Sequence, residues 1–484
     1  MSGYHSPERK RVVIAGGGFA GLWAARALSR ASEVEVLVLD RNNYHTFLPL
    51  LYQVAAAELE PEQIAYPLRG VFRRMDNVDF RLACVTGVDC HARMVRTDHG
   101  DVPYDYLILA MGSNTEFYGV HGAEEHSFRL KSLEQAIALR NHILTRFELA
   151  AHEPDPDAQR RMLTFAVVGG GPTGVEYAGA LAELIRTPIA KDFPDFNTGQ
   201  ARVVLLEASD GLLAGYPEPL RQYTFRRLAR MGVDVRLRAT VARVEPQAVI
   251  FKDAAPLPTE TVVWSAGIQG NRTARHMGLP LGRGGRVDVL PSLQLAGHPD
   301  VYVAGDLSMP QEGGKPLAAP MIAPNATQQG TLAAQNILRH IRGQEQRPFR
   351  YADKGAMATI GRSSAVVRIG KRTATGFVAW VLWLFVHLAY LIGFRNRLFV
   401  MVNWAWDYLF FERSVRLILP RIPWLERNGF DASGFCVGDD SSAACAEQAA
   451  SHATPRSGSH AASGQANFKA TSKADSTAQS QAKR

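Results

Sequence analysis

Two glycine clusters with the same spacing carry the clearest chemical signal in the sequence. Their members are Gly16, Gly17, Gly18 and Gly21 in the first cluster, and Gly169, Gly171 and Gly174 in the second. In this spacing the first glycine allows a tight turn, a central one leaves room for a pyrophosphate, and the last lets a helix pack closely on a strand. Because a helix N-terminus favours anions, the clusters predict two dinucleotide-binding sites.

A carboxylate follows each cluster at the end of a later apolar run. Asp40 lies at close to the usual distance after Gly16 for the acidic residue that holds a ribose hydroxyl. Glu207 comes later than usual after Gly169, because a polar insertion at residues 191–200 lengthens the connection. Each acid is therefore predicted to accept hydrogen bonds from a ribose.

These residues must be positioned by strands and helices in alternation. Apolar strands at 12–14 and 163–168 lead into the two clusters, and helices at 22–28 and 175–185 leave them. Elements that alternate in this way form parallel sheets covered by helices. The internal duplication predicts an α/β fold with two Rossmann-like dinucleotide-binding domains.

Three later strands are predicted to return to these sites. One ends in Ala110-Met111-Gly112, and another ends in the matching pair Ala266-Gly267. The third, at 301–303, is followed by Gly305 and Asp306. A carboxylate at the carboxyl end of a strand can accept hydrogen bonds from sugar-like hydroxyls, although a turn-forming Asp after Gly is the alternative.

The charge distribution and the cysteine content limit which macromolecular partners and metal centres the protein can have. Of the net charge of +8, most belongs to residues 361–430, which carry ten basic and three acidic residues and are also apolar. This combination indicates an anionic membrane surface and no nucleic acid. The four cysteines do not form a disulfide framework, a metal site or an iron–sulfur motif. No apolar run precedes the first strand, so we expect no secretory signal.

The apolar segment Phe377–Phe394 raises the question of a membrane span. Its 18 residues just reach the length of a spanning helix. Basic residues flank it on both sides. A single span would therefore leave one basic cluster on the far side of the membrane, against the positive-inside rule. The next stretch, Leu398–Phe411, is rich in the aromatic residues that favour a headgroup boundary. We therefore predict two helices that lie in the membrane interface, with a buried soluble pair and a true span as alternatives.

Several longer motifs resemble the type II NADH dehydrogenases, the non-proton-pumping NADH:quinone oxidoreductases within the two-dinucleotide-binding flavoproteins. They are NYH at 43–45 with PLLYQVA, IAYPLR at 64–69, GPTGVEYAGALAEL from Gly171, APNATQQG at 323–330 and KGAMATIG at 354–361. The resemblance covers roughly residues 10–425. It implies FAD at the first glycine cluster and NADH at the second.

The resemblance also implies a division of the chain. An FAD-binding domain would comprise 10–118 and 285–350, and an NADH-binding domain would comprise 119–284. A membrane-associating region would follow at 351–430. The remaining residues, 431–484, are rich in Ser, Ala, Gln and Lys, and predict a disordered tail.

Site residues follow from the same resemblance. Asp40 and Asp306 would bind the FAD ribose and ribityl chain, and Glu207 would bind the NADH ribose and repel a 2′-phosphate. Glu176 resembles a Glu near the nicotinamide and flavin, with a helix-dipole acid as the alternative. Gln328 would reach the flavin ring and the quinone, although the preceding Gln of the motif is replaced by Pro324.

The implied activity is FAD-dependent NADH:quinone oxidoreduction in a respiratory chain without proton pumping. We expect a peripheral, monotopic protein on the cytoplasmic face of the inner membrane, and a homodimer is one expected state because dimers are common among relatives. A soluble reductase for ferredoxin or rubredoxin, or a non-catalytic flavoprotein redox sensor, would share both glycine clusters. The soluble reductase would have no use for the basic aromatic segment.

Overall fold

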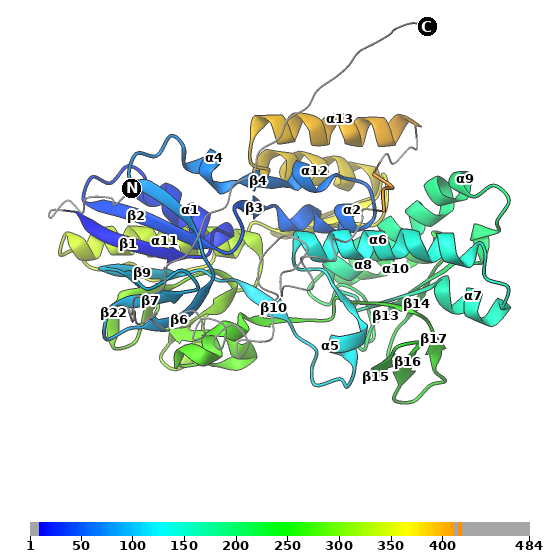
Figure 1. Ribbon diagram of the computed structural model, residues 1–484, viewed down its shortest axis with the longest axis horizontal. Coiled ribbons are helices and arrows are strands. Elements are labelled where there is room, and N and C mark those ends of the chain that lie inside the picture. Colours follow the sequence, from blue (N-terminus) through cyan, green and yellow to red (C-terminus); the bar gives the residue numbers. More distant parts are fainter. Residues whose placement is uncertain (1–8, 411–414, 419–484) are drawn as a thin grey trace, which may run out of the picture. The chain divides into compact units, whose positions relative to one another are not determined.

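The computed structural model describes residues 9–410 and 415–418, so the predicted tail lies outside the described residues. Its larger sheet has six strands (Figure 1). In spatial order they are β21 (Gln294–Leu295), β22 (His298–Val303), β9 (Tyr106–Leu109), β1 (Lys10–Ala15), β2 (Val34–Asp40) and β5 (Val78–Leu82). β1 runs parallel to both β2 and β9. Two distant segments of the chain therefore share one sheet.

Two helices pack together beside this sheet. α1 (Phe19–Leu28) begins at the first glycine cluster, and α11 (Ala323–Ile341) packs closely against α1. A Cβ at Gly330 would lie 2.0 Å from the carbonyl oxygen of Ala20, so only glycine permits this approach. The contact brings the motif at 323–330 next to the first glycine cluster.

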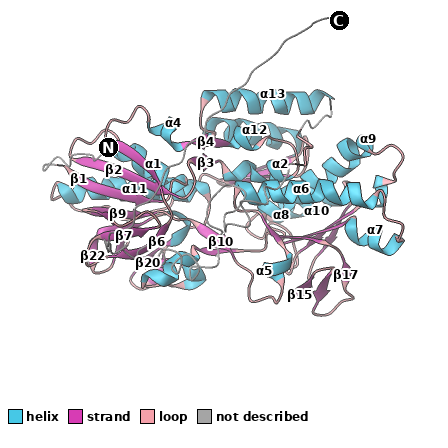
Figure 2. Cartoon of the chain, in the orientation of Figure 1, coloured by secondary structure: helices cyan, strands magenta, loops and turns pink. Residues whose placement is uncertain are grey.

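The second sheet has five parallel strands. Their order is β11 (Phe128–Arg129), β18 (Thr261–Trp264), β12 (Thr164–Val168), β13 (Arg202–Leu206) and β14 (Val233–Arg236). The main helices of this part of the chain are α6 (Leu133–Ala150), α8 (Pro172–Leu184) and α10 (Glu218–Arg230) (Figure 2). The three central strands, β18, β12 and β13, are almost wholly buried and mainly apolar, as expected for a parallel sheet covered by helices. The predicted α/β fold with two dinucleotide-binding sheets is confirmed.

The chain passes between the two sheets at one antiparallel ribbon. β10 (Ser113–Thr115) pairs with β19 (Ile268–Gly270), so the outgoing and returning segments lie side by side. Smaller sheets decorate both halves. They are β3 (Tyr44–Thr46) with β4 (Ala65–Pro67); β6 (Val85–Asp89), β7 (Met94–Thr97) and β8 (Val102–Pro103); β15 (Val241–Glu245), β16 (Ala248–Phe251) and β17 (Leu257–Pro258); and β20 (Val287–Val289), β23 (Ser308–Glu312) and β24 (Lys315–Pro316).

Residues 47–64 do not share the core of the first sheet. This segment contains α2 (Leu51–Ala55) and α3 (Pro61–Ile64). Its buried side chains belong to the same hydrophobic core as those of α6, α8 and the C-terminal region. The segment thus packs against α6, α8 and the C-terminal region, which lie far from it in the sequence.

The C-terminal region begins with an antiparallel sheet and ends in two helices. The sheet contains β25 (Ala356–Thr359), β26 (Ala365–Ile369) and β27 (Arg372–Thr375), and the helices are α12 (Gly376–Tyr390) and α13 (Phe394–Phe410). The apolar segment Phe377–Phe394 is therefore not one helix, because a turn containing Gly393, with a φ of +88°, separates the two helices. No helix within the described residues is both long and apolar enough to cross a bilayer.

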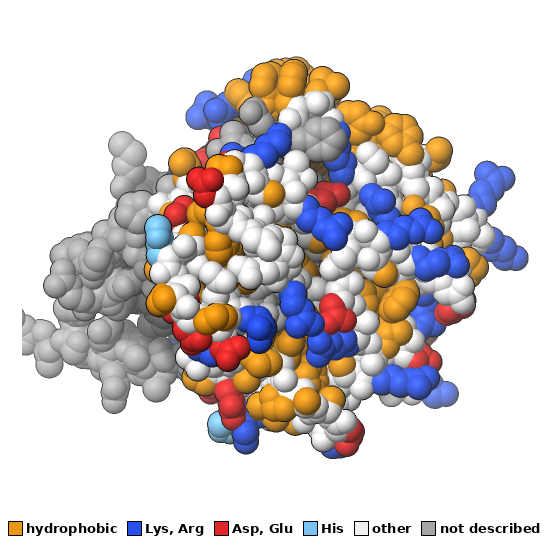
Figure 3. Space-filling view, turned by 90° about the vertical axis from the view of Figure 1, so that its right-hand side faces the viewer, with side chains coloured by type: hydrophobic (Ala, Val, Ile, Leu, Met, Phe, Trp, Pro, Cys, Tyr) orange, Lys and Arg blue, Asp and Glu red, His pale blue; other side chains and the backbone are white. Residues whose placement is uncertain are grey.

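Both C-terminal helices present apolar side chains to solvent, and Figure 3 shows hydrophobic side chains gathered at the top of the molecule, where α13 lies in Figure 1. Phe394 is 81% exposed, and Val378 and Phe385 are at least 70% exposed. The other exposed apolar side chains of these helices are Phe377, Val381, Tyr390, Leu398, Phe399, Met401, Val402, Trp406, Tyr408, Leu409 and Phe410. We call this set the apolar face.

Candidate functional site

The two glycine loops have matching backbone geometry. Gly16 and Gly169 both have a φ of +110°, in the region that favours glycine. A Cβ at Gly21 would lie 1.8 Å from the carbonyl oxygen of Gly16, and one at Gly174 would lie 1.9 Å from that of Gly169. Each loop therefore holds its helix against its own strand, as the sequence predicts.

The central glycine of each loop faces open space. A Cβ on Gly18 or Gly171 would meet no protein atom within 4 Å. α1 begins directly after Gly18 and α8 directly after Gly171, so unpaired backbone N–H groups at these helix ends are available to a ligand. Both loops thus fit a pyrophosphate group.

Asp40 and Glu207 occupy equivalent positions. Asp40 Oδ2 accepts a hydrogen bond from the N–H of Gly17 at 2.6 Å, and Glu207 Oε2 accepts one from the N–H of Gly170 at 2.6 Å. Burial raises the pKa of Asp40, although the N–H groups of Asn42 and Gly17 lower it in part. Each carboxylate is therefore fixed beside its loop, with oxygen lone pairs left to accept ribose hydroxyls.

A cavity of about 870 Å³ connects the first loop to α12. Gly16, Gly17, Gly18, Asp40, Ala110, Gly112 and Asp306 all line this cavity. Pro172, Thr173 and Glu176 of α8 also line it. The main cavity thus unites the residues predicted for the first nucleotide and places the start of the second nucleotide's helix on its wall.

Beside Asp306 lie two part-buried polar side chains, Ser113 and Lys131, that no sequence motif identifies. Ser113 Oγ donates to Asp306 Oδ2 at 2.7 Å, and Lys131 Nζ donates to Ser113 Oγ at 2.9 Å. Burial lowers the pKa of Lys131, while the nearby Asp306 carboxylate raises it. Ser113 and Lys131 come from segments far from Asp306 in the chain, so only the fold brings them together.

Glu176 lies between the main cavity and a second, smaller one. It is on α8, two residues after Gly174, and its Oε1 accepts a hydrogen bond from the N–H of Thr359 at 3.3 Å. The part of its side chain that remains accessible faces these two cavities. Burial raises its pKa to about 8, so the carboxyl is mainly protonated at neutral pH.

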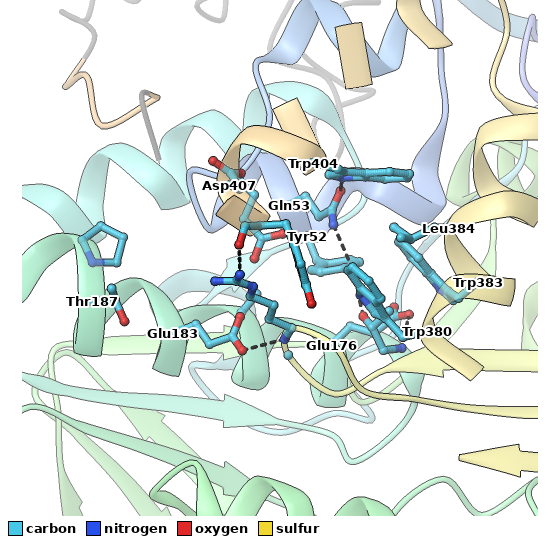
Figure 4. A pocket seen from close by; sticks show the side chains of 17 residues that line it. Tyr52, Gln53, Glu176, Glu183, Thr187, Trp380, Trp383, Leu384, Trp404 and Asp407 are labelled. Carbon is cyan, nitrogen blue, oxygen red and sulfur yellow. Dashed lines mark hydrogen bonds between the residues drawn. The ribbon is translucent and has the colours of Figure 1, made fainter. Parts of the chain in front are cut away.

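The second cavity, of about 160 Å³, lies beneath the C-terminal helices (Figure 4). Trp404 of α13 donates from Nε1 to Gln53 Oε1 at 3.1 Å, and Gln53 Nε2 donates to the Tyr52 hydroxyl at 3.3 Å. The Tyr52 hydroxyl is 2.8 Å from Thr359 Oγ1. A chain of hydrogen bonds therefore links α13 to the residue whose N–H binds Glu176.

Two histidines, the buried His45 and the half-buried His387, also line the main cavity. His45 Nδ1 is 3.1 Å from the carbonyl oxygen of Gly17, and His387 Nδ1 is 2.8 Å from that of Trp383. Burial lowers the pKa of each ring to about 4. Both rings are therefore neutral. His45 belongs to the NYH motif, but the sequence offered no specific role for either ring.

Two predicted site residues have other surroundings. Gln328 does not line the main cavity, because its side-chain amide forms two hydrogen bonds with the backbone of Ala352. The neighbouring Gln329 is fully buried, and its Oε1 accepts from the N–H of Gly305 at 2.7 Å. Gly267 packs against Tyr118, whose hydroxyl would lie 2.3 Å from a Cβ at that position, and Gly267 does not line the cavity either.

Comparison with known proteins places this geometry in a family. Residues 10–330 match the family model described as pyridine nucleotide-disulphide oxidoreductase, and residues 354–413 match the NDH2 C-terminal domain. The type II NADH:quinone oxidoreductase Ndh of Mycobacterium tuberculosis is 38% identical over 423 residues, which cover 84% of this chain and 90% of that protein. The chain belongs to the type II NADH:quinone oxidoreductases.

Other members of the family are similar over comparable lengths. The type II NADH:quinone oxidoreductase of Staphylococcus haemolyticus is 30% identical and covers 76% of this chain and 92% of its own length. The structure of NDH2 from Plasmodium falciparum in complex with NADH matches with a TM-score of 0.77 at 17% identity, over 85% of this chain and all of that one. At that identity the structural match supports the fold alone.

Proposed function

We propose that this family member transfers two electrons from NADH to a membrane quinone with FAD as its resident cofactor. The observation that carries the proposal is the main cavity, which runs from the first glycine loop, past Glu176, to α12. Leu48, Ile322 and Tyr390 line it and are also exposed, so its edge is apolar beside the C-terminal helices. An apolar opening suits a lipid-soluble electron acceptor.

The residues present fit FAD. The open space at Gly18 would take the pyrophosphate, Asp40 would hold the adenosine ribose, and Asp306 would hold the ribityl hydroxyls. When bound, FAD supplies the capacity to accept a hydride and pass on two electrons. The chain's part is to fix the distance and orientation of the reactants and to exclude water.

The second loop supports an NADH site. Gly171 leaves room for the pyrophosphate, while Gly169 and Gly174 hold the loop and helix that surround it. Glu207 lies where its carboxylate would accept from both ribose hydroxyls and would repel a 2′-phosphate. NADH is therefore the favoured nucleotide over NADPH.

Proton stoichiometry gives Glu176 a catalytic role in this proposal. The overall reaction, NADH + H⁺ + quinone → NAD⁺ + quinol, consumes one proton that the hydride does not supply. The Glu176 carboxyl carries a proton at neutral pH and lies on the wall of the cavity where the quinone would react. Glu176 would deliver that proton and regain it from the side of the second cavity.

The apolar face supports peripheral attachment to a membrane. α12 and α13 expose large apolar and aromatic side chains, and the guanidinium of Arg395 lies 5.0 Å from the centre of the Phe399 ring. Helices with this composition lie in the headgroup region of an anionic bilayer. We place this face on the cytoplasmic side of the inner membrane; a homodimer on that surface is compatible with this placement.

Anaerobic stopped-flow measurements on the FAD-loaded protein test the proposal. NADH should bleach the flavin absorbance, and a short-chain quinone should restore it at a rate compatible with steady-state turnover. Flavin that is reduced by NADH but reoxidised only by ferredoxin or rubredoxin would support the soluble reductase instead. Flavin that neither reaction changes would refute any catalytic function.

A further inference from the structure

His387 interrupts an apolar helix at the wall of the main cavity. It lies on α12, stacks on Trp383 with the ring centres 4.0 Å apart, and meets the Phe47 ring edge-on at 6.2 Å. An imidazole in such surroundings loses hydration unless its polar atoms find partners. The position of its two nitrogens therefore determines what the ring can bind.

The hydrogen bond to Trp383 fixes the tautomer of the ring. The carbonyl oxygen of Trp383 can only accept, so Nδ1 must carry the hydrogen in the 2.8 Å contact. Burial lowers the pKa of His387 to about 4, which keeps the ring neutral under ordinary conditions. Nε2 is then an acceptor without a proton.

The ring that carries this acceptor lines the cavity. Among the described residues, no side chain or backbone group donates to His387 Nε2, and the atom is not sealed inside the protein as an unpaired buried group. The ring belongs to the cavity wall together with Val386 and Tyr390, close to the exposed apolar edge. A molecule entering from the membrane side would therefore meet an acceptor and no donor at this ring.

Quinone and quinol differ at this point in their chemistry. The carbonyl oxygens of a quinone only accept hydrogen bonds, whereas each hydroxyl of a quinol can donate one. An acceptor offers nothing to the oxidised headgroup and a hydrogen bond to the reduced one. A hydrogen bond that only the reduced headgroup can make tightens quinol binding and leaves quinone affinity unchanged.

We propose that His387 Nε2 accepts a hydrogen bond from a hydroxyl of the newly formed quinol and so makes the site selective for the reduced headgroup. This inference rests on the proposed quinone reductase function. In the reaction above, each quinone oxygen gains one proton as two electrons arrive, and one of the resulting O–H groups donates to Nε2. His387 transfers no proton itself.

The test compares quinol and quinone binding in the FAD-loaded wild-type enzyme and in three variants. His387→Phe keeps the stacking on Trp383 and removes the acceptor, whereas His387→Gln retains an acceptor oxygen. His99→Phe removes a histidine from an exposed turn and serves as the matched control. Anaerobic titration with a short-chain quinol and the corresponding quinone, followed by tryptophan fluorescence quenching, gives both dissociation constants.

We expect His387→Phe to weaken quinol binding by about 3- to 10-fold, the size of one net hydrogen bond, and to leave quinone binding within about twofold. Product inhibition by quinol should weaken by the same factor, and His387→Gln should recover part of it. Equal weakening of quinol and quinone, or no change in either, would overturn the proposal. Failure of the proposed function is distinguishable, because the wild-type enzyme would then not reduce quinone at all.

Discussion

Replacing Glu176 by Gln should stabilise the folded protein but impair its quinone reductase activity. The side-chain oxygen of Gln can still accept from the Thr359 N–H. What the substitution removes is a carboxyl whose charged form the fold disfavours. The folded-state pKa of about 8 lies above the ordinary value of 4.5, so the folded chain binds more protons than the unfolded chain between those pH values. Stability therefore falls as pH rises from about 4.5 to about 8.

The size of this effect follows from the two pKa values. At 1.36 kcal/mol per pKa unit, the carboxyl lowers the free energy of unfolding by less than about 1 kcal/mol at pH 5, roughly 3 kcal/mol at pH 7 and roughly 5 kcal/mol at pH 9. For a folded body on the order of 400 residues, one kcal/mol shifts the Tm by roughly 1 °C. Water in the two cavities screens the charge, so these values are upper limits.

Differential scanning fluorimetry of the FAD-loaded proteins measures the effect. The Tm of Glu176→Gln should exceed that of the wild type by about 1 °C at pH 5, about 4 °C at pH 7 and about 6 °C at pH 9. Glu148→Gln, on the exposed face of α6, controls for the loss of a surface carboxylate. A Tm difference that stays constant or shrinks with rising pH would refute the assignment of Glu176 as a buried, protonated carboxyl.

Further predictions concern the nucleotides and the membrane. Gly18→Ala should fold but lose FAD, because its Cβ would fill only ligand space. For the same reason Gly171→Ala should keep FAD but raise the KM for NADH roughly tenfold or more. Flavin absorbance measures the first effect and steady-state kinetics the second. Glu207→Gln should reduce the preference for NADH over NADPH by about tenfold, measured as the ratio of kcat/KM values. Phe385→Glu with Leu409→Glu should abolish most sedimentation with anionic vesicles and leave reduction of a soluble quinone within about twofold.

The glycine loops can be predicted from the sequence because their structure depends on neighbouring residues. Tight turns, helix starts and acids at strand ends depend on residues close together in the chain, so the pattern of residue types alone is enough to place Gly16, Gly169, Asp40 and Glu207. Long-range contacts cannot be read in this way. Ser113 on β10, Lys131 between β11 and α6, and Asp306 after β22 meet only because the fold brings these three segments together.

Gln328 shows a different limit of sequence reasoning. Adjacent residues on a helix point in different directions, so one position decides whether an amide meets a cavity or the surface. The prediction placed Gln328 at the flavin and quinone, but its amide binds Ala352 and the buried Gln329 holds Gly305 instead. Likewise, apolar composition could not reveal that Gly393 divides Phe377–Phe394 between two helices.

His387 and Glu176 add polar groups to the wall of the main cavity without adding charge. A charged side chain there would require hydration or a counterion, and either would oppose the entry of a lipid-soluble headgroup. Burial instead keeps the His387 ring neutral and leaves Glu176 mostly protonated. One group can then accept a hydrogen bond and the other can release a proton, while neither adds charge to the wall before the reaction begins. Because Glu176 follows Gly174 by only two residues, the helix that we propose receives NADH would also set the position of the proposed proton donor.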